Sequence, residues 1–320
     1  MAPLYEQNTL HIDAALTDFA IGYGQDPSNF IGARIAPPVF VSNISDSYWV
    51  GGKEAFNVPN VKRVAGALFP RVNLARSTDR YNCEGFGIEV AVTREEVAMA
   101  DAALTPEQDA TQTAVEALML NAERRIAAIV QSTSSFPHYH ALADDEKFDN
   151  PLSDPIGIIE NAKEEIAIKL GVLPNKLVLG RKVYKALRQH PDLLGRVSGV
   201  MVQRMLNTQQ LADFFEVDEV IVPLGRYNSA SDPDDAVLAD IWGDCAILAY
   251  VDPTTGPMRA RKVCPIRTFV WTGSPGGGRF AVEQYYEPQT RTNVVQTTDF
   301  TDEKVVDNDA LYQFTTVLSA

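Results

Sequence analysis

The residues best suited to chemistry in this 320-residue chain are His138 and His140, with an acidic run close behind them. On a strand, residues two apart share a face, so both imidazoles could meet one metal ion, with Asp144 or Asp145 as a further ligand. The pair lies in a connection rich in proline and acidic residues, however, which favours a solvated loop. The sequence therefore predicts no metal site, and a metal-dependent enzyme using His138 and His140 stays as an alternative.

Other signatures of catalysis or cofactor binding are incomplete. Gly51-Gly52-Lys53 is followed by Glu54 and lacks the Walker spacing, and the glycine run 276–278 lacks the GxGxxG spacing. There is no GxSxG elbow for a Ser-His-Asp assembly, and the cysteines form no CxxC pair. The sequence therefore predicts no catalytic residue, no cofactor-binding residue and no cofactor. The three cysteines, Cys83, Cys245 and Cys264, are typical of folding in a reducing compartment.

Composition and charge exclude further classes. The chain carries 42 acidic and 28 basic side chains, a formal charge of −14. That acidity argues against binding nucleic acid by neutralising phosphates, and against docking on anionic lipid. No apolar run approaches the roughly 20 residues that cross a bilayer, and the first residues do not read as a signal peptide. A hydrophobic content of 45% is that of a globular protein with one large domain or two medium ones.

Two segments near the N-terminus have apolar surface but no core of their own. Residues 1–36 form an arm with too many apolar side chains for a solvated tail, so we expect it to lie along its own subunit or a neighbour. Residues 37–93 are β-rich, and alternation from Phe86 to Val92 predicts a half-buried strand. Between its ends, at about 44–85, lies a long excursion of the kind that is usually functional. Its basic residues favour a contact with an acidic neighbouring subunit, and a solvated hairpin is the alternative.

A long helix follows at about 105–131. Thr105 is the expected N-cap, Pro106 the first helical residue, and Gln108 the partner in a capping box. Apolar residues at steps of three and four then continue to Val130.

The second half of the chain alternates helices with short apolar strands, which predicts an α/β unit of about 110 residues. Its first helix is capped by Asp154, opens at Pro155 and stops at Gly171. The further elements expected are strands at 176–180, 219–223, 246–251, 267–271 and 280–286, and helices at 181–197 and 201–215.

Three stretches resemble the major capsid proteins of tailed bacteriophages, in particular the lambda-like capsid family. The likeness covers residues 150–320 and is weak for the first hundred residues, where only the order of elements agrees. The matching stretches are Asn175–Leu194 (NKLVLGRKVYKALRQHPDLL), Phe214–Val222 followed by Ile241–Val251, and Thr268–Trp271 with Glu283–Tyr286, Lys304–Val306 and Ala310–Tyr312.

The resemblance implies the Hong Kong 97 phage capsid fold, which is α+β. Its parts here would be an N-terminal arm (1–36), a peripheral domain (37–151), an axial α/β domain (152–262) and a return to the peripheral domain (263–320). The first peripheral part would hold an extended β-hairpin loop at about 44–85 and the spine helix at about 105–131. Adjacent subunits complete the arm and the loop in this family, which would explain why neither has its own core.

By the same resemblance, the chain is expected to be a structural head protein and not an enzyme. It would assemble through pentamers and hexamers into an icosahedral shell that encloses double-stranded DNA without sequence-specific binding. Scaffold, portal and decoration proteins are the further partners implied, with no membrane. The protein would be made in the host bacterial cytoplasm and reside in the virion. An encapsulin-like compartment shell is the alternative with the same fold. The expected subunit contacts are Trp49, Phe56, Val61, Lys62, Arg63, Leu68, Phe69, Arg71 and Arg76.

Overall fold

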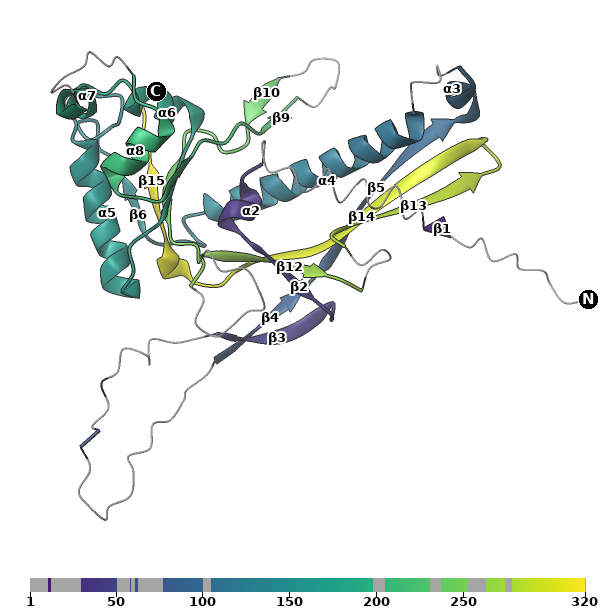
Figure 1. The fold of residues 1–320 in the computed structure, drawn as a ribbon, viewed down its shortest axis with the longest axis horizontal. Coiled ribbons are helices and arrows are strands. Elements are labelled where there is room, and N and C mark those ends of the chain that lie inside the picture. The colour runs from purple at the N-terminus through teal and green to yellow at the C-terminus, as the bar shows by residue number, and fades with distance from the viewer. Residues whose placement is uncertain are drawn as a thin grey trace, which may run out of the picture.

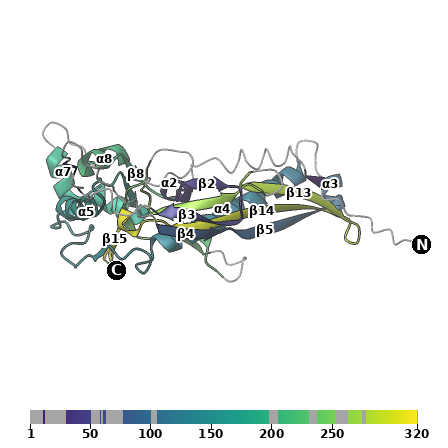
Figure 2. The ribbon, with the colours of Figure 1, turned by 90° about the horizontal axis from the view of Figure 1, so that it is seen from below.

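The molecule is long and thin, with a helix-rich half at one end and an extended sheet at the other (Figures 1 and 2). No helix in the part of the chain that the structure describes is both long and apolar enough to span a membrane. The structure is a computed structural model, and it describes residues 11–12, 30–50, 58, 61–62, 77–99, 105–197, 205–230, 237–252, 263–273 and 278–319.

The extended half is a six-stranded sheet centred on one long strand, β14. Its order is β1-β13-β14-β12-β2, and β5 also pairs with β14. β14 is antiparallel to β13, β12 and β5, whereas β2 is parallel to β12. The strands are β1 (His11–Ile12), β2 (Pro38–Val41), β5 (Glu84–Thr93), β12 (Ile266–Trp271), β13 (Phe280–Glu287) and β14 (Thr292–Val305).

The predicted long helix is α4 (Pro106–Val130), and it lies along this sheet (Figure 1). Its Val115 and Leu118 pack against Phe280 and Val295 of the sheet. Pro106 opens the helix as expected, but the predicted capping box is wrong. The Thr105 hydroxyl donates to the Gln108 side chain at 2.6 Å and makes no bond to the helix backbone.

The helix-rich half is built on a five-stranded sheet of order β6-β15-β11-β7-β8, with four helices packed on one face. The strands are β6 (Tyr139–Ala141), β7 (Lys176–Leu179), β8 (Glu219–Ile221), β11 (Ala246–Ala249) and β15 (Leu311–Thr315). The helices are α5 (Pro155–Leu170), α6 (Arg181–Leu187), α7 (Pro191–Val197) and α8 (Thr208–Phe215).

The ends of these helices follow local chemistry. Asp154 accepts from the amide of Gly157 at 3.1 Å to cap α5, and Gly171 ends it in the left-handed region, both as predicted. The helix expected at 201–215 begins only at Thr208, because Asn207 caps it with a full capping box. Residues 201–204 lie outside the described residues.

The remaining elements connect or extend the two halves. A second core, on the other face of the five-stranded sheet, joins α2 (Gly32–Ile35) and the end of α4 to Phe136 and Trp242. Two ribbons stand apart from the large sheets. They are β3 (Ser45–Val50) with β4 (Ser77–Asn82), and β9 (Arg226–Asn228) with β10 (Leu238–Asp240); the short helices α3 (Arg94–Met99) and η2 (Asn308–Ala310) complete the described elements.

Candidate assembly surfaces

Ribbon β3–β4 forms the foot of the predicted excursion and projects from the large sheet (Figure 1). A two-stranded ribbon alone is marginally stable in water, so its root needs an anchor. Tyr81 stacks on Phe269 of β12 with ring centroids 4.5 Å apart, and Tyr48 packs against the same ring at 5.2 Å. These three rings fix the direction in which the ribbon leaves the body.

Polar contacts tie the same root to β14. The Tyr48 hydroxyl donates to Asp79 at 3.0 Å, the Lys304 ammonium lies 3.6 Å from Asp79, and the Asn82 amide donates to Asp302 at 2.8 Å. Burial acts to raise the pKa of Asp79, but the hydrogen bonds it accepts and the nearby Lys304 outweigh burial and lower that pKa. The root therefore holds an ionised carboxylate at neutral pH.

Of the predicted contact residues, Trp49, Val61 and Lys62 fall on described positions. Trp49 is 53% exposed and Val61 is 78% exposed, while Lys62 is also exposed. Val58, which sequence reasoning did not select, is 95% exposed in the same excursion. The others, Phe56, Arg63, Leu68, Phe69, Arg71 and Arg76, lie outside the described residues.

A buried carboxylate joins three segments where the two halves meet. Glu123 of α4 is 4% exposed and accepts hydrogen bonds from the amides of Ile31 (2.9 Å) and Gly32 (2.7 Å) and from Trp242 Nε1 (2.7 Å). Burial raises the pKa of Glu123, although the three donors oppose the shift. The partners lie 91 to 119 residues away in the chain, so no local sequence motif predicts this junction.

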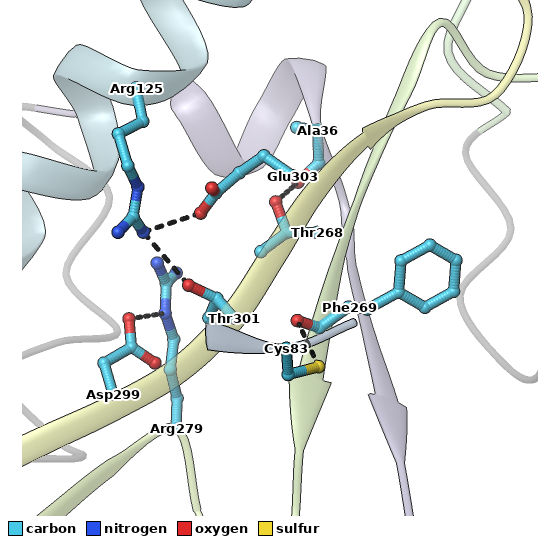
Figure 3. Close-up of polar contacts among 9 residues, drawn as sticks. All are labelled: Ala36, Cys83, Arg125, Thr268, Phe269, Arg279, Asp299, Thr301 and Glu303. Carbon is cyan, nitrogen blue, oxygen red and sulfur yellow. Dashed lines mark hydrogen bonds and ion pairs between the residues drawn. The ribbon is translucent and has the colours of Figure 1, made fainter. Parts of the chain in front are cut away.

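Charged groups also position α4 on β14 (Figure 3). Arg125 donates to Glu303 at 2.7 Å and to Thr301 at 3.0 Å, and Arg279 pairs with Asp299 at 3.3 Å. Burial raises the pKa of Asp299. Buried pairs of this kind add little net stability but are costly to break, so the Arg125 pair fixes the register of α4 on β14, and the Arg279 pair holds the start of β13 on β14.

The two histidines take separate protein partners. His138 Nε2 lies 2.7 Å from Asp309 and its Nδ1 lies 2.6 Å from the Lys169 ammonium, so both ring nitrogens are engaged. His140 Nε2 lies 2.8 Å from Glu146. His140 belongs to strand β6, which corrects the expectation of a loop there. Among the described residues no cluster of three or more metal-ligating side chains occurs.

Comparison with known proteins gives similarity over most of the chain, although no family model matches. The major capsid protein of Burkholderia phage BcepMu is 34% identical over 250 residues, which cover 75% of this chain and 76% of that protein. The major capsid protein of Pseudomonas phage JBD67 is 24% identical over 245 residues, covering 75% and 77% of the two chains.

Solved structures agree with these relatives. A phage-related protein from Bordetella bronchiseptica RB50 superposes with a TM-score of 0.76 at 27% identity, over 96% of this chain and 98% of that one. The capsid of cyanophage P-SCSP1u has a TM-score of 0.57 at 10% identity, covering 88% and 86%. The SrpI encapsulin of Synechococcus elongatus PCC 7942 has a TM-score of 0.51 at 11% identity, covering 88% and 85%. The last two likenesses concern the fold alone, which is that of the Hong Kong 97 phage capsid.

Proposed function

The chain belongs to the phage major capsid proteins, and from that premise we propose how it builds and fills its shell. Its role is structural, as a component of an icosahedral capsid. We infer that copies first form rings of five and six, which then close the shell around a double-stranded DNA genome. The 34% identity to a phage major capsid protein carries this proposal. It also favours a phage head over an encapsulin-like compartment, because the encapsulin likeness is limited to fold.

We propose that the two halves of the molecule correspond to the two domains of the capsid fold. The large sheet with α4 would be the peripheral domain, and the five-stranded sheet with α5 to α8 the axial domain. The rings of Tyr81, Tyr48 and Phe269 would hold the root of the extended loop so that Trp49 and Val61 reach the adjacent subunit. Scaffold, portal and decoration proteins would be further partners, and synthesis would take place in the host bacterial cytoplasm.

The shell would retain the DNA by enclosing it and not by binding it. A chain of formal charge −14 repels phosphates, so empty shells should bind free DNA weakly at every ionic strength. Binding that falls steeply as salt rises would instead indicate a basic inner wall.

Sedimentation velocity and negative-stain microscopy of the purified chain, alone and with its scaffold, test the assembly itself. We expect rings in equilibrium with closed shells of megadalton mass. A chain that stays monomeric at high concentration in both conditions would overturn the proposal. Trp49→Ser tests the loop: onset of assembly should move to about tenfold higher protein concentration, because an exposed aromatic anchor is lost. Its unfolding midpoint before assembly should not move.

A further inference from the structure

Ribbon β9–β10 presents an open face with one apolar anchor. The register places Tyr227 and Ala239 opposite each other, and Arg124 of α4 covers the Tyr227 ring at 4.3 Å. Side chains alternate between the two faces of a ribbon, so Leu238 and Arg226 lie on the face away from α4. Leu238 is 61% exposed there.

Basic side chains lie on the ribbon and on the adjoining helix α6. Arg181 and Arg226 share Asp240, at 3.4 and 2.8 Å, which links the first turn of α6 to the ribbon. Lys182 pairs with Asp244 at 3.0 Å, and Lys185 follows on the next turn of α6 and is exposed. Among the described residues, the basic patch therefore has four cations against two carboxylates. Its members are Arg181, Lys182, Lys185 and Arg226, with Leu238 as its anchor.

Helix α5 carries the opposite combination. Its buried stripe includes Ile159, Ile166 and Leu170, which places Ile168 on the opposite side of the helix, where it is 77% exposed. Glu164 and Glu165 precede Ile168 by four and three residues and therefore flank it on the helix surface. An isoleucine with this exposure on the outermost line of a helix has no core to fill.

Acidic side chains dominate around Ile168. Lys163 lies 2.6 Å from Glu160 and 3.6 Å from Glu216 of the adjoining α8 turn, but its own side chain is buried. The Lys169 ammonium pairs with Glu165 and contacts His138. The acidic patch on α5 thus sets three carboxylates against two largely occupied lysines. Its members are Glu160, Glu164 and Glu165, with Ile168 as its anchor.

Helix α5 lies at the outer end of the helix-rich half, whereas ribbon β9–β10 lies on the side toward α4 (Figure 1). Helices α5 and α6 both pack on one face of the five-stranded sheet, and Arg181 at the start of α6 reaches Asp240 of the ribbon, whereas Ile241, next to the ribbon, packs against the core on the other face. A contact between two different patches of identical chains is heterologous, and repetition of it gives a ring when the rotation between copies closes. Opposite charge around an apolar anchor on each side gives that contact its orientation.

We propose that the acidic patch of α5 on one copy docks on the basic patch of ribbon β9–β10 and α6 on the next copy around each ring. This contact rests on the proposed shell function and names the surfaces that would form its rings. Ile168 and Leu238 supply the apolar centre, and the charged side chains form the rim.

Charge exchange tests the contact. Glu164→Lys and Lys185→Glu alter exposed side chains, and each would set like charges against each other in every contact. We expect each variant to move the onset of assembly to about tenfold higher protein concentration, since reversal replaces a rim attraction by repulsion. The double variant restores opposite charges and should assemble within about threefold of the unaltered chain.

Mixing the two single variants gives a sharper result. In a ring where they alternate, the lysine introduced by Glu164→Lys on one copy would face the glutamate introduced by Lys185→Glu on the next. The native pair would form at the following contact. Alternation closes only in even-numbered rings, so the mixture should recover six-membered rings and disfavour five-membered ones. Raising the salt should weaken the defect of either single variant, because rim charges are screened.

Further variants distinguish loss of this contact from the effect of a substitution elsewhere on the surface. Ile168→Ser and Leu238→Ser should each raise the onset concentration about tenfold with little salt dependence, as expected for loss of an apolar anchor. Glu116→Lys, on the exposed side of α4, should leave the onset unchanged. Normal shells from all four patch variants, or a double variant worse than both singles, would overturn the contact while leaving the capsid function standing. Failure of the unaltered chain to assemble would overturn both.

Discussion

Replacing Glu123 by Gln tests whether one buried carboxylate holds the two halves of the subunit together. Its oxygens accept from two backbone amides and from Trp242 Nε1, all at 2.7 to 2.9 Å. A glutamine side chain has one oxygen and one NH2 group, so at least one of these three donors would face another donor. That donor would stay buried without a partner.

The expected cost follows from those bonds. A hydrogen bond to a charged group contributes about 1.5–3 kcal/mol, and a buried donor left unpaired costs about 1–3 kcal/mol. Glutamine also removes the burial penalty of the charge, which offsets part of this loss. We therefore expect the free energy of unfolding to fall by about 2–3 kcal/mol, which moves a urea midpoint down by roughly 1 M for an m-value of about 2–3 kcal/mol/M.

The pH dependence of this cost has a fixed sign. Burial raises the pKa of Glu123 above its unfolded value, so the stability it contributes is full below the unfolded pKa and declines as pH rises through the folded one. The difference between the unaltered chain and Glu123→Gln should therefore be larger at pH 5 than at pH 8. A difference that grows with pH would show that the three donors outweigh burial.

The assay is urea unfolding of the unassembled chain, followed by tryptophan fluorescence and circular dichroism. Glu116→Gln is the matched control, because Glu116 is exposed on the same helix, and its effect should stay within about 0.5 kcal/mol. A double-mutant cycle with Trp242→Phe should give a coupling of about 1 kcal/mol or more between the two residues. An unchanged midpoint for Glu123→Gln, or simple additivity in the cycle, would refute the reasoning.

Two glycines and the three cysteines give further tests of the same unassembled chain. A Cβ on Gly180 would clash with the carbonyl oxygen of Gly243, so Gly180→Ala should destabilise the chain by about 1–3 kcal/mol or more in urea unfolding. Gly195→Ala, in open space within α7, should stabilise it by about 0.5–1 kcal/mol, and loss of stability there would contradict the helix. Burial raises the pKa of Cys83 and Cys264 to about 11 and that of Cys245 to about 12, so a thiol reagent at pH 8 should modify all three only after denaturation. Rapid reaction in the native state would count against their burial.

The parts of the fold that sequence predicts are those with a local signal. Helix α4 runs from Pro106 to Val130, within one residue of the range that its periodicity predicts at each end. Alternation correctly predicted a half-buried strand from Phe86 to Val92, and in β5 this apolar face packs against α4. Periodicity works here because an apolar core lies on one side of each element and water on the other.

Strand β14 shows where that reasoning fails. It is the centre of the large sheet, yet its buried positions on the α4 side include Thr297, Asp299 and Thr301. The partners of Thr301 and Asp299 are Arg125 and Arg279, which come from other elements. An alternating apolar pattern is therefore missing, and the strand is not recognisable without its neighbours.

The candidate surfaces likewise divide into those with a local sequence signal and those without one. Trp49 and Val61 were predicted as contacts because they lie in a segment without a core, and both are exposed. Their role as contacts stays a prediction. Ile168 and Leu238 gave no such signal, because each lies in an ordinary element, and only the packing of that element shows which side of it is open. Exposure depends on tertiary structure, so the proposed ring contact could be inferred only from the structure and not from the sequence.

The separation of the exposed apolar anchors is consistent with a shell. Ile168, Leu238 and Trp49 are single exposed anchors on separate elements, each with polar or charged neighbours, and do not form one broad apolar face. A stable pair of proteins typically needs about 800 Å² from each partner in one interface.

A copy inside a shell is held by several neighbours at once, so each new contact forms at high effective concentration and can be weak alone. Weak contacts also let misplaced copies dissociate before the shell closes. It follows that loss of one anchor should shift the concentration at which assembly begins, whereas simultaneous loss of anchors in the loop and in the ring should abolish assembly.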